Sequence, residues 1–296
     1  MKIALTGGTG FVGDHFATEA TRSGHDIIII GRQADRSSVV TKAGTQLPYH
    51  ATDYSTASLT EILDGCNAVV HMAANRPTSD WTVQKYVENV KISQNLFDAC
   101  CAQGIDNVVV FSSRSVYSIH NPIPWTEDMA VIPTNLYGAS KAAVEILASH
   151  YNAFKGLRCK CLRLAQVLGY GEHGGYVLNT FIDRASQGQA LELHGSGAGR
   201  REYIYIKDVV SAVFSALEHP STHGYFNIGT GTNISIIELA QLINDVFANT
   251  GNLNVIPAAK EDTNSYLMSV EKTRQVLQWS AQWSMRAALE DMRDLR

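Results

Sequence analysis

Short runs of β-branched and apolar residues alternate with amphipathic stretches through the first two-thirds of the chain. The apolar runs lie at residues 2–6, 26–30, 68–73, 107–113 and 159–165. Continuous apolar character of this length is typical of strands buried on both faces of a parallel sheet. Amphipathic helix patterns lie between them, at residues 11–24, 81–103 and 136–154. This alternation predicts an α/β fold built on a doubly wound parallel sheet.

A glycine-rich turn, TGGTGFVG, joins the first predicted strand to the first predicted helix. A tight turn without Cβ atoms lets backbone N–H groups approach a pyrophosphate, and the partial positive charge of the helix N-terminus favours the bound anion. We therefore expect a Rossmann-type dinucleotide site with contacts from Gly7, Thr9, Gly10, Phe11, Val12 and Gly13. The alternative is a turn that needs glycine only for close packing of helix on strand.

The character of the chain changes after residue 169. Stretches 169–181 and 193–203 are rich in glycine, and 250–266 is predicted to be a loop. Further helices are predicted at 178–187, 207–218, 235–248 and 284–293. We expect residues 1–168 to form the dinucleotide-binding domain, with 202–232 returning to it. The smaller, irregular substrate-binding lobe would comprise 169–201 and 233–296.

The end of the second predicted strand bears on the choice of cofactor. An NAD-binding chain carries a carboxylate there for the ribose 2′-hydroxyl, whereas this chain has Gly31 and Arg32, with Arg36 nearby. A guanidinium suits a 2′-phosphate, so NADP(H) is favoured and NAD(H) is the alternative. Arg32 could instead stack on the adenine or face water. Asp53 and Tyr54 are further candidate cofactor contacts; Asp53 would meet the adenine amino group, or alternatively cap a helix.

Ser113, Tyr137 and Lys141 form the candidate catalytic group. Tyr137 and Lys141 are one helical turn apart, and Ser113 ends a predicted strand. A phenol has an unperturbed pKa of ~10, so it transfers protons poorly at neutral pH unless a cation stabilises the phenolate. Lys141 can supply that cation, while Ser113 could donate a hydrogen bond to the same substrate oxygen. The alternative is a polar loop beside an ordinary helix surface.

Charge and composition exclude several classes of function. The formal net charge is −4 and no run of five like charges occurs, so we expect no nucleic-acid-binding face and no membrane anchor. The N-terminus begins directly with a strand-like run and shows no signal-peptide core, so we expect a cytoplasmic protein. The five cysteines and ten histidines lack the spacing of metal ligands, so we expect buried free thiols and no metal site.

The chain resembles an extended short-chain dehydrogenase/reductase of the NAD-dependent epimerase/dehydratase family. The best-known members, such as UDP-galactose 4-epimerase, act on nucleotide sugars. Nearly the whole length carries the resemblance: TGGTGFVG, VVHMAA, ENVKISQNLFDAC, FSSRSVY, YGASK, GRREYIYIKDVV and FNIGTGTNISIIELA occur in the order of the family.

The resemblance implies further roles for single residues. It makes Ser113, Tyr137 and Lys141 a catalytic triad, with Tyr137 and Lys141 also contacting the cofactor. Further cofactor contacts would come from Ala73, Ala74, Arg76 and Asn89, of which Arg76 would lie near the phosphates and Asn89 would be more structural than chemical. Arg201 matches the arginine that in relatives holds the diphosphate of a nucleotide sugar; the alternative is a surface arginine.

Two departures from the family pattern narrow the reaction. Dehydrating relatives have an Asp-Glu pair after the catalytic hydroxyl, where this chain has Arg114 and Ser115, so dehydration is not expected. Gln166 replaces an asparagine that is usual near the sugar. Arg114 and Gln166, with Ser113 and Arg201, are therefore the candidate substrate-binding residues.

The resemblance implies an NAD(P)-dependent enzyme that transfers hydride at a nucleotide-sugar carbon, most simply C4, as a 4-ketoreductase or a 4-epimerase. Two other functions stay open: a reductase of a non-nucleotide carbonyl compound, and a non-catalytic NAD(P)-sensing regulator. The long helices predicted at 81–103 and 136–154 resemble those that pair into a four-helix dimer interface in the family, so we expect a homodimer.

Overall fold

The computed structural model describes residues 1–75, 81–172, 175–259 and 261–296. Its centre is an eight-stranded sheet in the order β12-β7-β6-β5-β1-β2-β4-β3, in which every neighbouring pair is parallel except the antiparallel pair β3 and β4. The strands are β1 (Lys2–Thr6), β2 (Asp26–Gly31), β3 (Ser38–Val40), β4 (Gln46–Ala51), β5 (Ala68–His71), β6 (Asn107–Ser113), β7 (Arg158–Leu164) and β12 (Gly224–Ile228). The predicted α/β fold is thereby confirmed.

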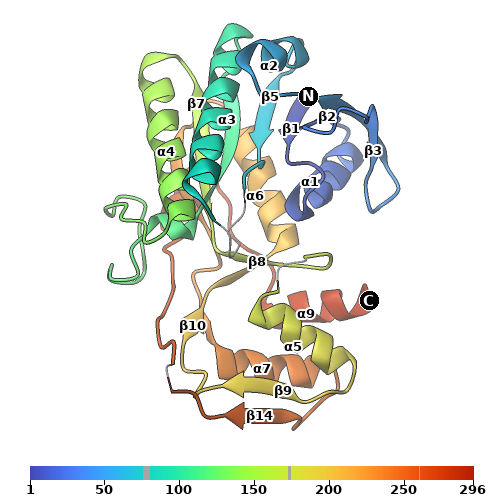
Figure 1. Cartoon of the computed structure of the whole chain (residues 1–296), viewed down its shortest axis with the longest axis vertical. Helices are drawn as coiled ribbons and strands as arrows, with labels where there is room; N and C mark the ends of the chain where they lie inside the picture. The colour runs from blue at the N-terminus through green and yellow to red at the C-terminus, as the bar shows by residue number, and fades with distance from the viewer. Residues whose placement is uncertain (76–80, 173–174, 260) are drawn as a thin grey trace.

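Helices cover both faces of this sheet (Figure 1). One face carries α1 (Phe11–Arg22), α6 (Ile206–Glu218) and α8 (Glu271–Val276), and the other carries α2 (Thr56–Ile62), α3 (Val83–Ala102) and α4 (Leu136–Phe154). Successive strand residues point to opposite faces: Ile3 and Leu5 pack with α1, whereas Ala4 packs with α3. This two-sided burial explains why the strands are continuously apolar in sequence.

A smaller lobe has a core of its own, below the sheet in Figure 1. It comprises α5 (Val177–Ser186), β9 (Leu191–His194), α7 (Ile236–Val246), β14 (Leu253–Ile256) and α9 (Met285–Asp294). The loop predicted at 250–266 was wrong in part, because β14 lies within it and pairs in parallel with β9. This strand is short and none of its four residues is buried, so it lacks the continuous apolar run that marks a buried strand.

The chain crosses between the two lobes several times. Strand β8 (Gln166–Leu168) pairs with β11 (Tyr203–Tyr205), and β10 (Arg200–Arg201) pairs with β13 (Ile234–Ser235). After β11 the chain returns to the large sheet, where α6 contacts α1 and β12 pairs with β7. The exact lobe boundaries stay a prediction. No helix among the described residues is long and apolar enough to span a bilayer.

Candidate active site

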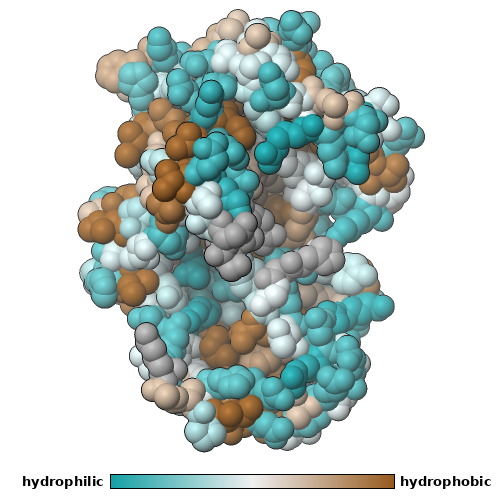
Figure 2. Space-filling model, viewed as in Figure 1, coloured by the Kyte–Doolittle hydropathy of each residue, from teal (hydrophilic) through white to brown (hydrophobic). Residues whose placement is uncertain are grey.

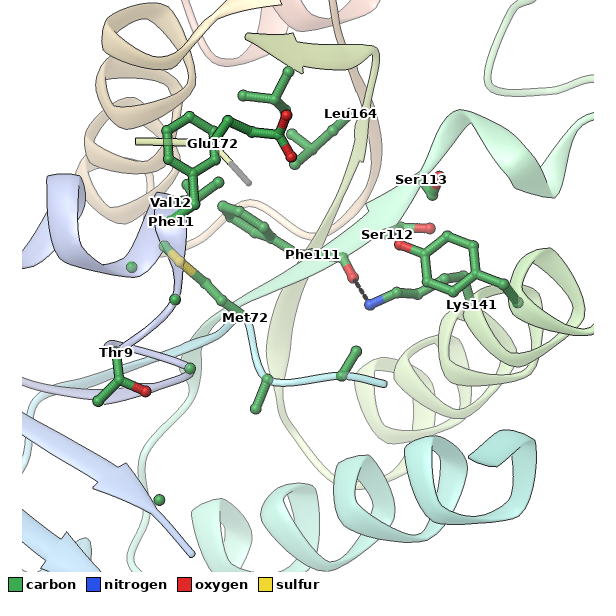
Figure 3. Close-up of a pocket in the computed structure, with 18 of the residues that line it drawn as sticks. Thr9, Phe11, Val12, Met72, Phe111, Ser112, Ser113, Lys141, Leu164 and Glu172 are labelled. Atoms are coloured by element: carbon green, nitrogen blue, oxygen red, sulfur yellow. Dashed lines mark hydrogen bonds between the residues drawn. The ribbon is translucent and has the colours of Figure 1, made fainter. Parts of the chain in front are cut away.

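A cavity of about 630 Å³ opens at the carboxyl edge of the central sheet, on the side of the smaller lobe. In open α/β sheets this edge is where ligands bind. The predicted residues that line it are Gly7, Thr9, Gly10, Phe11, Val12, Gly13, Arg32, Tyr54, Ala73, Ala74, Ser113, Arg114, Tyr137, Lys141 and Gln166. In Figure 3, Thr9, Phe11 and Val12 lie on one side of the cavity and Ser112, Ser113 and Lys141 on the other.

The N-terminus of α1 forms the first end of the cavity. Gly10 is the N-cap, and the first backbone bond of the helix runs from the Asp14 N–H to the Gly10 carbonyl. The N–H groups of Phe11, Val12 and Gly13 precede that bond, so they have no partner within the helix. A Cβ on Gly13 would lie 2.2 Å from the Gly7 carbonyl oxygen, so only glycine lets the turn close this tightly. This cradle fits a dinucleotide pyrophosphate.

The end of β2 forms a second part of the cavity. A Cβ on Gly31 would lie 2.3 Å from Oη of Tyr49, which also accepts a hydrogen bond from the Gln33 N–H at 2.9 Å. Tyr49 is buried, and Arg32 is exposed at the rim of the cavity. Packing therefore leaves no room for a carboxylate side chain at residue 31, and the next residue, Arg32, brings a guanidinium to this part of the cavity.

Ser113, Tyr137 and Lys141 converge at the opposite end. Ser113 is the last residue of β6, and its hydroxyl accepts a hydrogen bond from the Ser115 N–H at 3.1 Å. Asn135 caps α4 by accepting the Gly138 N–H at 2.8 Å, which places Tyr137 in the first turn. Lys141 lies one turn further on, as the spacing predicted.

The Lys141 ammonium group is buried beside the tyrosine. It donates a hydrogen bond to the Phe111 carbonyl at 2.7 Å (Figure 3) and lies 5.8 Å from the centroid of the Tyr137 ring. Burial lowers the pKa of Lys141 to about 8. At neutral pH the group keeps its positive charge, and a cation at this distance favours the phenolate form of a tyrosine.

A buried polar network supports the floor of this end. The Ser112 hydroxyl donates to Glu145 Oε1 at 2.6 Å, and Arg163 binds both oxygens of the same carboxylate at 2.9 and 2.7 Å. Arg163 also donates to the Tyr117 hydroxyl at 2.7 Å. Burial alone would lower the pKa of Arg163, but the hydrogen bonds and charge of Glu145 hold it above its ordinary value. The pair fixes α4 against β6 and β7, and with it Lys141.

A second network holds the segment after β5. His71 Nδ1 lies 2.7 Å from the Thr6 hydroxyl and Nε2 lies 3.0 Å from the Ser93 hydroxyl. Since Ser93 donates its hydrogen to the Asn89 carbonyl at 2.8 Å, Nε2 must be the protonated nitrogen and Nδ1 the acceptor. Thr6 also accepts the Ala73 N–H at 3.3 Å. The network therefore anchors the backbone that lines the cavity.

Several predicted cofactor residues do not line the cavity. Asn89 is buried and its side chain binds both the N–H of Asn75, at 2.7 Å, and its carbonyl, at 3.3 Å. The Asp53 carboxylate accepts the Ser55 N–H at 2.8 Å, just before α2. Arg36 is exposed away from the cavity. Arg76 lies outside the described residues.

A second cavity of about 330 Å³ adjoins the first and shares Gln166 and Tyr176 with it. Arg201 lines it, paired with the Asp262 carboxylate. The Arg201 guanidinium also lies 4.5 Å from the centroid of the Tyr266 ring, and the Arg114 guanidinium lies 4.3 Å from the same centroid. Two of the predicted substrate-binding residues, Arg114 and Arg201, thus contact the same aromatic ring, that of Tyr266.

The cavity is also lined by residues that the sequence analysis did not propose as site residues. They are Ile30, Gly31, Gln33, Tyr49, Met72, Phe111, Ser112, Ser115, Leu164, Ala165, Val167, Glu172 and Tyr176. Ser112 and Ser115 lie within two residues of the predicted Ser113, so their position in the sequence could have identified them as site residues. Glu172 and Tyr176 come from the irregular segment after β8, where no periodicity indicates which side chains face inward.

The family model for the NAD dependent epimerase/dehydratase family matches residues 3–229. The chain belongs to this family. A family relative, the UDP-glucose 4-epimerase of Corynebacterium glutamicum, is 29% identical over 98% of this chain and 94% of its own length. The solved UDP-N-acetylglucosamine 4-epimerase from Bacillus cereus is 34% identical, with a TM-score of 0.89 over 100% of this chain and 96% of its own. MoeE5, solved in complex with UDP-glucose and NAD, is 27% identical, with a TM-score of 0.85 over 99% of this chain and 98% of its own.

Proposed function

We propose that this protein is a nucleotide-sugar 4-epimerase that uses a nicotinamide dinucleotide. The observation that carries the proposal is the convergence of Ser113, Tyr137 and Lys141 at one end of a cavity whose other end is a helix N-terminus fit for a pyrophosphate. The family and the named 4-epimerases that resemble the chain over almost all of its length support the same reaction.

The chain's own residues would carry out proton transfer and positioning. When bound, the nicotinamide would supply the hydride acceptor and donor for the sugar carbon. Tyr137 takes the proton from the C4 hydroxyl and returns it to the oxygen after the sugar has turned its other face. Lys141 holds the positive charge that favours the phenolate, and Ser113 donates a hydrogen bond to the same oxygen. The N–H groups at the start of α1 bind the pyrophosphate.

The second cavity would hold the nucleotide part of the substrate. Arg201 contributes a positive charge to its lining, and Gln166 and Tyr176 line both this cavity and the one that contains the catalytic residues. An arginine fork suits a diphosphate, which a neutral carbonyl compound does not carry. This argues against the reduction of a non-nucleotide carbonyl compound.

A second candidate, an NADPH-dependent nucleotide-sugar 4-ketoreductase, is favoured by the end of β2. Tyr49 excludes a carboxylate at Gly31, and Arg32 offers a positive charge to a 2′-phosphate. An epimerase returns its hydride within one turnover, whereas a reductase consumes NADPH. The two functions therefore differ in whether a reduced cofactor disappears.

The test is to incubate the purified protein with UDP-glucose or UDP-N-acetylglucosamine and follow both the C4 epimer and the absorbance of reduced nicotinamide. Epimer formation without net oxidation supports the 4-epimerase. Stoichiometric loss of NADPH with a 4-keto nucleotide sugar would instead establish the 4-ketoreductase. Dinucleotide binding without turnover of any nucleotide sugar would support the non-catalytic regulator.

Substitutions at the catalytic end of the first cavity test the proposed role of each residue in the same assay. Tyr137→Phe should lower turnover by about 10²- to 10⁴-fold while dinucleotide binding survives, since only a hydroxyl is lost. Lys141→Met should lower both turnover and dinucleotide binding, and Ser113→Ala should have a smaller effect on turnover than either of these substitutions. Tyr170→Phe, an exposed tyrosine outside the cavity, is the matched control. Near-normal turnover by Tyr137→Phe would contradict the mechanism.

We also propose that the protein is a homodimer through α3 and α4. These helices lie side by side and leave large apolar side chains exposed: Val83 and Val87 on α3, and Ile146 and Phe154 on α4. Apolar surface gathers over this part of the molecule in Figure 2. The spacing i, i+4 and i, i+8 places each pair on one stripe, as a helix-pairing surface requires.

A further inference from the structure

The guanidinium of Arg114 lies in an environment that does not balance its charge. Arg114 follows Ser113 at the start of η1 (Arg114–Val116), is only partly exposed, and lines the same cavity as Tyr137. The guanidinium lies over the face of Tyr266, 4.3 Å from the ring centroid. Within the described part of the chain, no carboxylate forms an ion pair with it and no acceptor takes a hydrogen bond from its five N–H groups.

The other inward-facing arginines of this region are compensated by the protein. Arg163 binds Glu145 through two hydrogen bonds, and Arg201 is paired with Asp262. Glu202 acts on Arg114 through its charge, but its own oxygens accept the N–H groups of Thr230, Gly231 and Met268. Among the described residues, Arg163 and Arg201 are thus paired with acids, whereas Arg114, which lines the cavity, has no ion pair.

A partly buried positive charge at Arg114 costs free energy when no anion lies beside it. Burial lowers the pKa of Arg114 below its ordinary value, which reflects the cost of keeping a cation out of water. A bound anion would offset that cost and use the planar donors as a bidentate fork. The preferred ligand is therefore one that brings a negative charge to this position.

The place of Arg114 indicates which part of a substrate carries the charge. The residue is adjacent to Ser113, to which the proposed mechanism gives the hydrogen bond to the reacting oxygen, and it lines the first cavity, whereas Arg201 lines the second. A diphosphate held at Arg201 leaves the sugar at Ser113 and Tyr137. The anion that meets Arg114 then belongs to the sugar itself.

We propose that Arg114 binds a carboxylate on the sugar, beside the carbon that reacts, so that this protein prefers nucleotide sugars with an acidic sugar over their neutral counterparts. This inference rests on the proposed function. The carboxylate could be an oxidised sugar carbon, as in a uronic acid, or an acid attached through an ether, as in a lactyl group. Both present the same planar anion to the guanidinium.

The experiment measures dissociation constants and kcat/KM for two matched pairs of substrates. The pairs are UDP-glucuronic acid with UDP-glucose, and UDP-N-acetylmuramic acid with UDP-N-acetylglucosamine. The wild-type protein should prefer the acidic member of one pair by about 10- to 100-fold, the value of a hydrogen-bonded charge pair, and that pair identifies the source of the carboxylate. Arg114→Gln should bring the acid-to-neutral ratio close to one, and Arg114→Lys should keep part of it. Arg22→Gln, an exposed arginine of α1, controls for net charge.

Each remaining outcome is decisive. Equal losses on acidic and neutral substrates in Arg114→Gln would assign the residue to the diphosphate or to packing on Tyr266, and would overturn the inference while the proposed function stands. A wild-type preference for both neutral sugars would overturn it as well. Turnover of none of the four substrates would refute the proposed function and the inference with it. The melting temperature of each unliganded variant separates loss of folding from loss of binding.

Discussion

The buried His71 predicts a specific dependence of stability on pH. Burial, with a smaller contribution from the charge of Lys141, lowers the pKa of His71 to about 3. An unfolded histidine has a pKa of ~6.5, so below that pH the unfolded chain binds a proton that the folded chain does not. The contribution of His71 to stability is therefore fully present above about pH 6.5, and it is lost as the pH falls toward the pKa of the folded state.

The size of the effect follows from proton linkage. Between pH 7 and pH 5, one histidine that stays neutral in the folded state and titrates with a pKa of ~6.5 in the unfolded state lowers the free energy of unfolding by about 2 kcal/mol. The hydrogen bonds explain why His71 resists the proton: Nδ1 accepts from Thr6, and a proton there would leave that hydroxyl without the acceptor it uses.

The assay is the free energy of unfolding from urea titrations at pH 7 and pH 5, for the wild type, His71→Gln and the control His120→Gln, which replaces an exposed histidine. Carboxylates also titrate in this window, so the informative quantity is the difference between variants. His71→Gln should lose about 2 kcal/mol less than the wild type between the two pH values, and His120→Gln should match the wild type.

Equal pH-dependent losses in the wild type and His71→Gln would refute the argument that His71 is held neutral. Should His71→Gln not fold, the ¹⁵N chemical shifts of the His71 ring in the wild type answer the same question. They should report a neutral ring with the proton on Nε2 at pH 5.

Two further predictions concern the cofactor and the assembly. Arg32→Ala should weaken NADPH binding by about 10- to 100-fold with little effect on NADH, because a charge-assisted hydrogen bond to the 2′-phosphate is lost; equal wild-type affinities for the two cofactors would contradict the preference for NADP(H). Placing lysines at exposed Ile146 and Phe154 should convert a dimer into the 32.3 kDa monomer in sedimentation experiments at micromolar concentration. A monomeric wild type would reject the interface.

The elements that the sequence predicted well are those whose residue types are determined by burial within the layers of the fold. The strand predicted at 107–113 is β6 as observed, and the helix predicted at 136–154 is α4. The glycine turn and the Tyr-Lys spacing could also be predicted from the sequence. The tight turn requires glycine, and a separation of four residues places two side chains on one face of a helix. Strand β14 was not predicted, since its partner β9 is some sixty residues away in the chain and little of it is buried.

Electrostatic partners were the least predictable part of the site. The sequence analysis did not identify Glu145, which accepts hydrogen bonds from Ser112 and Arg163. His71 belonged to a recognisable motif, yet its tautomer depends on Ser93 from α3. Such roles depend on side chains that meet only after the sheet has been assembled, and no local pattern encodes them.

The end of β2 shows why cofactor preference is a property of two strands and not of one residue. Gly31 could be mutated to aspartate to supply the carboxylate that suits NAD, but the new Cβ would meet Oη of Tyr49 from β4 at 2.3 Å. Tyr49 is buried and its hydroxyl accepts the Gln33 N–H, so it cannot move aside without loss. A carboxylate at position 31 therefore requires a smaller residue at position 49 as well, because packing against Tyr49 excludes the acidic side chain before charge is considered.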